Sequence, residues 1–62
     1  MPVVTITMAK GRSYKQKKTL AHEIAGSVST VLGVPLERVT IFIHELEAEN
    51  IALSGELLSE PK

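Results

Sequence analysis

The chain has 62 residues, no net charge and no cysteine, which predicts one domain over residues 1–62 and excludes disulfides and thiolate metal sites. A neutral chain is a poor partner for nucleic acid, no apolar run approaches the ~20 residues that span a membrane, and the N-terminus lacks the pattern of a signal peptide, so we expect a cytoplasmic protein. A chain of this length has a thin core, so an apolar content of 44% predicts self-association.

The first predicted strand covers residues 3–8, where β-branched residues alternate and Val4, Ile6 and Met8 share one face. Pro2 stands directly before it. If Met1 is removed, the ring nitrogen of Pro2 changes from an amide into a free secondary amine. An α-amine titrates near ~7.7–8.0 and burial lowers that pKa, so it can act as a general base near neutral pH. The competing interpretation is a proline that only opens a strand.

A helix is predicted over residues 13–32. Ser13 and Gln16 have the spacing of a capping box, and Gly33 and Pro35 supply stop signals. Apolar residues at steps of three and four form one stripe, which consists of Leu20, Ala21, Ile24, Ala25, Val28, Val31 and Leu32. The solvated side is expected to carry Lys15, Lys17, Lys18, His22 and Ser29.

Residues 34–38 form a connector with one helical turn at Pro35. Residues 39–46 form a nearly unbroken apolar run, which predicts a strand buried on both faces, as in a parallel sheet. A hairpin around Gly55 is predicted for residues 51–58. The expected fold class is therefore α/β (α+β), a single β-α-β unit with parallel strands and a short C-terminal hairpin. One face of its sheet lacks a cover, which predicts association with other subunits.

Several different short motifs are spread along nearly the whole chain. They are Met1-Pro2, Gly11-Arg12-Ser13, Gln16-Lys17, Thr19-Leu20, Pro35-Leu36, Glu45 at the end of an apolar strand, and Gly55-Glu56-Leu57. In this order the chain resembles the 4-oxalocrotonate tautomerases, the short members of the tautomerase superfamily. The resemblance implies β-α-β subunits that pair into dimers and assemble into a homohexamer, a trimer of dimers. It also implies a keto–enol isomerase without metal or cofactor, which acts on small unsaturated 2-hydroxy or 2-keto acids.

The resemblance also assigns roles to individual residues. Pro2 matches the proton-shuttling base, and Arg12 matches an arginine that holds a substrate carboxylate, often from a neighbouring subunit. A guanidinium suits this task because it stays charged and binds carboxylates through two hydrogen bonds, although a loop arginine taken alone is usually only solvated. Ile51 falls where the family has a pocket phenylalanine, and it would supply an apolar wall.

Thr40 marks a departure from the family pattern, because a second arginine that polarises the keto oxygen is expected there. Arg38, two residues earlier, is a displaced substitute. The strand period would place Arg38 on the same face at ~6–7 Å from the expected position, and a connector arginine is the competing interpretation. Loss of one donor to an enolate oxygen can cost ~10²–10³ in rate.

Other functions are compatible with the same residues. A hydratase or dehalogenase that uses Pro2 would need a water-activating carboxylate, for which the sequence offers no clear candidate. A non-catalytic subunit, or one partner of a heterohexamer, agrees with Thr40. The other titratable residues are better explained by solvated surfaces or packing than by metal or paired-carboxylate sites, and they are His22, His44, Glu45, Glu47 and Glu49.

Overall fold

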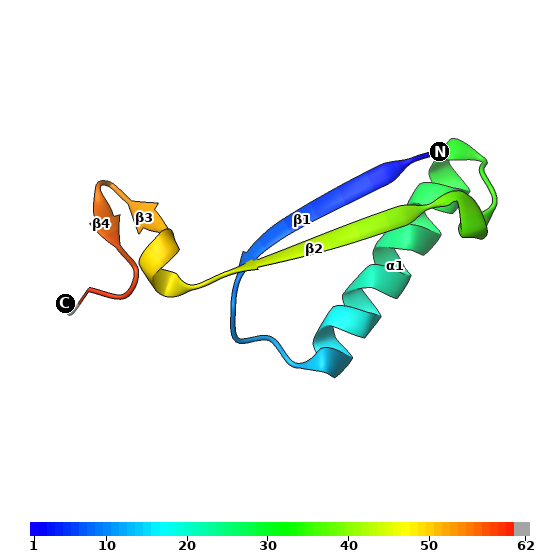
Figure 1. Cartoon of the computed structure of the whole chain (residues 1–62). Coiled ribbons are helices and arrows are strands. Elements are labelled where there is room, and N and C mark those ends of the chain that lie inside the picture. Colours follow the sequence, from blue (N-terminus) through cyan, green and yellow to red (C-terminus); the bar gives the residue numbers. More distant parts are fainter. Residues whose placement is uncertain (61–62) are drawn as a thin grey trace.

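A parallel strand pair and one long helix form the body of the chain, and a small hairpin projects from it (Figure 1). The computed structural model describes residues 1–60, so residues 61–62 of the predicted domain lie outside the described part. The elements are β1 (Val3–Ala9), α1 (Tyr14–Leu32), η1 (Leu36–Arg38), β2 (Thr40–Leu46), η2 (Ala48–Asn50), β3 (Ala52–Leu53) and β4 (Glu56–Leu57). The predicted β-α-β unit and C-terminal hairpin are confirmed. Along residues 1–60, no helix has the length and apolarity of a membrane span.

The register of the two long strands decides which residues share a face. β1 and β2 are parallel, with Val4 opposite Ile41 and Ile6 opposite Ile43. This face is half-buried, and its Ile43 lines a hollow together with Ala21 of α1. On the opposite face Val3 is 51% and Phe42 is 52% exposed. The prediction that the second strand is buried on both faces is therefore wrong for the single chain, because α1 covers only one of them.

The predicted start of α1 is confirmed in its hydrogen bonds. The Ser13 Oγ accepts from the Gln16 amide at 3.1 Å, and the Gln16 Oε1 accepts from the Ser13 amide at 3.0 Å. These reciprocal bonds satisfy two amides that a helix start otherwise leaves unpaired. The predicted stop is also confirmed, since Gly33 takes the left-handed conformation at φ 67°, which a glycine adopts without steric cost.

The predicted faces of α1 need correction at its C-terminal end. Val31 and Leu32 are 79% and 60% exposed, so neither belongs to a buried stripe within one chain. Ser29, which was expected on the solvated side, is half-buried. Its hydroxyl donates to the carbonyl of Val34 at 2.6 Å. After Gly33 the chain reverses, so Val34 lies against Ser29. Helical periodicity alone does not predict this contact, because it takes no account of the segment that follows the helix.

The single chain lacks a core of its own. Among residues 1–60 no side chain is fully buried. The Cα radius of gyration is 14.9 Å, whereas a compact chain of this length has about 11 Å. The accessible surface is 4982 Å², against about 3,900 Å² for a folded monomer of 6.7 kDa. The exposed apolar area and the elongated shape favour self-association.

This exposed surface leads to a prediction about dilution. We expect the apparent Tm to fall when the protein is diluted about a hundredfold, because a partner copy that binds only the folded chain stabilises it by mass action. Circular dichroism melts at both concentrations measure the shift, and sedimentation velocity reports the assembly in each sample. A melting curve that does not move, from a species that sediments as a monomer, would contradict the prediction.

Candidate active site

Pro2 is held at the end of the sheet where β2 begins. Its carbonyl accepts a hydrogen bond from the Thr40 amide at 3.0 Å. The Pro2 residue is half-buried, whereas Met1 is 83% exposed. The ring nitrogen of Pro2 is an amide as long as Met1 is attached. The N-terminus lies at the end of the sheet near η1 and the last turns of α1 (Figure 1).

Arg12 lies at the opposite end of β1, in the connection to α1. It is exposed and lines a hollow of about 290 Å³ together with Met8, Gln16, Lys17 and Leu20. β1 has seven residues, and a strand rises ~3.3 Å per residue, which separates its two ends by about 20 Å. One small substrate therefore cannot contact Pro2 and Arg12 of the same chain.

Ile51 also lies away from Pro2 of its own chain. It follows η2, beyond the end of β2, and its carbonyl accepts from the Leu58 amide at 2.8 Å. The residue is half-buried and belongs to the projecting C-terminal segment (Figure 1). An Ile51 wall for a site at Pro2 would thus have to come from a second copy.

Arg38 lies at the Pro2 end of the sheet, but not on a strand. It is the exposed last residue of η1, and the turn is closed by the Val39 amide, which donates to the Leu36 carbonyl at 3.1 Å. The expectation that strand periodicity gives Arg38 the same face as Thr40 is therefore wrong. A 3₁₀ turn rotates side chains by about a third of a turn per residue rather than alternating them.

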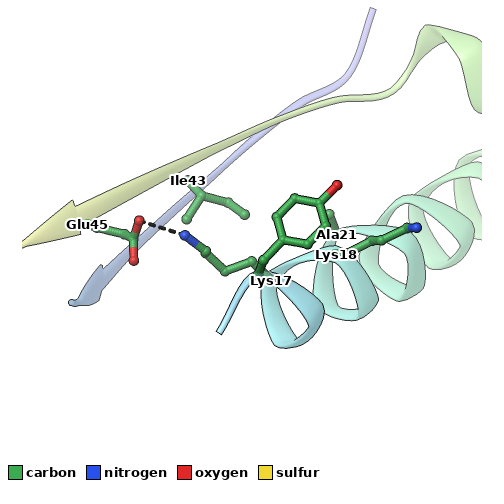
Figure 2. A pocket seen from close by; sticks show the side chains of 6 residues that line it. Lys17, Lys18, Ala21, Ile43 and Glu45 are labelled. Carbon is green, nitrogen blue, oxygen red and sulfur yellow. Dashed lines mark hydrogen bonds and ion pairs between the residues drawn. The ribbon is translucent and has the colours of Figure 1, made fainter. Parts of the chain in front are cut away.

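Two lysines form ion pairs that the sequence analysis did not predict. Lys17 was expected to be solvated, and Lys10 had no predicted role. Lys17 Nζ lies 2.9 Å from Glu45 Oε1, and these side chains are only 29% and 25% exposed. Figure 2 shows this pair bridging α1 and β2 beside Ile43. Lys10 Nζ lies 2.9 Å from Glu47 Oε1, with both side chains more than half exposed. The only sequence signal was the alternation of Glu45 and Glu47.

The second pair is intact at neutral pH. The hydrogen bond to Glu47 and the charge of its carboxylate raise the pKa of Lys10 above its ordinary value of 10.5. A pKa that folding raises means that the contact contributes fully below the unfolded value and is lost as the pH rises through the folded value. The contact therefore persists across the physiological range, and on the alkaline side it is lost as the pH rises through the pKa of Lys10.

The histidines do not build a metal site in the described part of the chain. His22 and His44 are both exposed, one on α1 and one on the bare face of β2. Within residues 1–60 no three residues among histidine, aspartate and glutamate lie close enough to share a metal ion.

Three comparisons place this geometry among known proteins. The family model described as "Tautomerase enzyme" matches residues 2–60. A probable tautomerase of Bacillus cereus is 40% identical over 60 residues, which are 97% of this chain and 98% of that protein. The 2-hydroxymuconate tautomerase of Bacillus subtilis is 33% identical over 60 residues, 97% of each chain. The heterohexamer 4-oxalocrotonate tautomerase of Chloroflexus aurantiacus superposes with a TM-score of 0.93 at 31% identity, over all of both chains.

Proposed function

Because the chain belongs to the tautomerase family, we propose that it is a cofactor-free isomerase that moves a proton between the enol and keto forms of small unsaturated 2-hydroxy and 2-keto acids. Pro2 is the base, after removal of Met1. The placement of Pro2 supports this role, since the residue is half-buried and its carbonyl accepts a hydrogen bond from the Thr40 amide at 3.0 Å. A base at the end of a regular strand is positioned more rigidly than one on a loose terminus.

The reaction needs only one proton acceptor. The free amine of Pro2 takes the proton from the enol hydroxyl or from an activated carbon, and the resulting ammonium returns a proton to the other carbon. Substrate and product have the same atoms, so no oxidant or second reactant is required. Cover by a neighbouring copy would desolvate the amine, which favours its neutral form.

The site is shared between copies. Pro2 and Arg12 lie at opposite ends of β1, so the Arg12 that faces a given Pro2 belongs to another chain. Arg12 holds the substrate carboxylate through two charge-assisted hydrogen bonds, and the neighbouring apolar side chains of Met8 and Leu20 suit the carbon skeleton. Ile51 of a neighbouring copy is the proposed apolar wall, and Arg38 is a candidate for contacts at the Pro2 end.

Thr40 supports a second candidate function. It lies beside Pro2 and supplies a hydroxyl where the family pattern has an arginine, so a complete site could need another subunit type. The similar Chloroflexus aurantiacus protein is a heterohexamer. On this alternative the chain is one subunit of a mixed assembly. Native mass spectrometry of the assembly from its host would then find a second chain, whereas a homohexamer gives a single subunit mass.

An enol–keto assay tests the proposed function directly. We expect the purified chain without Met1 to convert phenylenolpyruvate, with one carboxylate, at least as efficiently as 2-hydroxymuconate, with two, since Thr40 places no cation beside Pro2. Ultraviolet absorbance follows the loss of each enol, and a chelator should leave the rates unchanged. Rates equal to those in buffer alone, for both enols, would reject the proposal.

A further inference from the structure

The connection that carries Arg12 is tied to β2 on its strand side. The Lys10 amide donates to the Leu46 carbonyl at 2.9 Å, which continues the strand pairing by one residue. The Lys10 side chain then donates to the Glu47 carboxylate at 2.9 Å. Backbone and side chain of Lys10 thus hold the start of the connection to the last residues of β2.

The same connection is tied to β2 on its helix side. The Lys17 amide donates to the Ser13 carbonyl at 3.1 Å, which places Lys17 in the first turn of α1. The Lys17 side chain donates to the Glu45 carboxylate at 2.9 Å, as Figure 2 shows. The helix start next to Arg12 is therefore bound to the strand by a partly buried ion pair.

Arg12 lies between the two segments that these bonds hold to β2. It lies between Gly11, at φ 129°, and Ser13. Within residues 1–60 it takes part in no ion pair. A glycine at positive φ lets the backbone adopt many conformations. The exposed side chain of Arg12 also has many rotamers, so ordering Arg12 against a substrate would cost conformational entropy. Ties on both sides of Arg12 reduce that cost by holding its backbone in place.

We propose that Glu45 and Glu47 are positioning residues for Arg12. The two carboxylates, on either side of Leu46, hold Lys17 and Lys10 and so preorganise the Arg12 guanidinium for the carboxylate of the substrate. This inference rests on the proposed function and assigns residues beyond it. Glu45 has the larger effect, because its pair is 29% and 25% exposed and the Glu47 pair is more open to solvent.

A competing role for Lys17 predicts the opposite result. Lys17 lines the same hollow as Arg12, so it could bind substrate as a second cation once its charge is free. In that case removing the Glu45 charge would release the ammonium and lower KM. If Glu45 instead acts through the position of Arg12, removing its charge raises KM.

The test compares Glu45→Gln, Glu47→Gln and the matched control Glu49→Gln, an exposed glutamate of η2 without an ion pair in the described residues. We expect Glu45→Gln to raise KM for phenylenolpyruvate about two- to fivefold, as loss of a moderate ion pair would, with kcat nearly unchanged. Glu47→Gln should have a smaller effect that disappears in high salt. The methyl ester of the same enol, which lacks the carboxylate, should show no difference between variants.

A second readout does not depend on activity. In ¹⁵N relaxation experiments, Glu45→Gln should lower the backbone order parameters of Gly11 and Arg12, while Glu49→Gln leaves them unchanged. The charge exchange Lys17→Glu with Glu45→Lys should restore the backbone order of Gly11 and Arg12, which separates positioning from a folding defect. Unchanged order with unchanged KM, or a lower KM, in Glu45→Gln would overturn the inference. An inactive wild type with the expected relaxation changes would reject the proposed function alone.

Discussion

Replacing Pro2 with alanine is expected to lower kcat/KM for enol–keto conversion by about 10²–10⁴-fold, the usual contribution of a positioned general base. The variant still begins with an α-amine once Met1 is removed. It loses the ring that holds the nitrogen in line with β1, next to the hydrogen bond between the Pro2 carbonyl and the Thr40 amide. Steady-state kinetics measure the loss, on protein whose intact mass proves that Met1 is absent.

A second variant separates the nitrogen from the ring. Insertion of one residue before Pro2 keeps the proline but makes its nitrogen a non-basic amide, so a comparable loss is expected. Val3→Ala is the matched control, because Val3 is the next residue along the chain, lies on the bare face of the sheet and is 51% exposed. Equal rates in the wild type and both Pro2 variants, at equal assembly, would exclude Pro2 as the base.

Replacing Arg12 with alanine is expected to lower kcat/KM about 10- to 150-fold, mainly through KM. Hydrogen bonds to charged groups contribute about 1.5–3 kcal/mol, and Arg12 is the cation of the apolar hollow that no carboxylate neutralises within residues 1–60. Arg12→Lys should recover only part of the loss, since an ammonium cannot bind a carboxylate in the planar two-bond geometry. Kinetics with phenylenolpyruvate and its methyl ester check the assignment, because the ester should be nearly insensitive to Arg12.

Mixing the two inactive variants tests whether one site uses two copies. Pro2 and Arg12 lie at opposite ends of the seven-residue β1, so each site should take them from different chains. Pro2→Ala and Arg12→Ala chains, unfolded together and refolded as mixed oligomers, should regain activity in about a quarter of the sites if assembly is random and symmetric. Chains refolded separately and then combined are the control. Failure to regain activity in proven mixed oligomers would contradict a shared site.

The local structure of this chain could be predicted from its sequence because it depends on near neighbours. The alternation of Val4, Ile6 and Met8 predicted a strand, and the structure extends it by one residue to Ala9. Ser13, Gln16 and Gly33 predicted both ends of α1, since capping bonds and a left-handed stop involve residues only a few positions apart. Pro2 was identified as a candidate base from the chemistry of a free proline amine and Arg12 by resemblance, and the roles of both stay predictions.

The sequence by itself thus determined the order of elements, the family motifs and the need for a partner surface. Only the tertiary structure decided that Lys17 and Lys10 bind Glu45 and Glu47. These ion pairs join residues 28 and 37 positions apart. Such contacts depend on the parallel register of β1 and β2 and on where the helix packs, and no short-range periodicity encodes either.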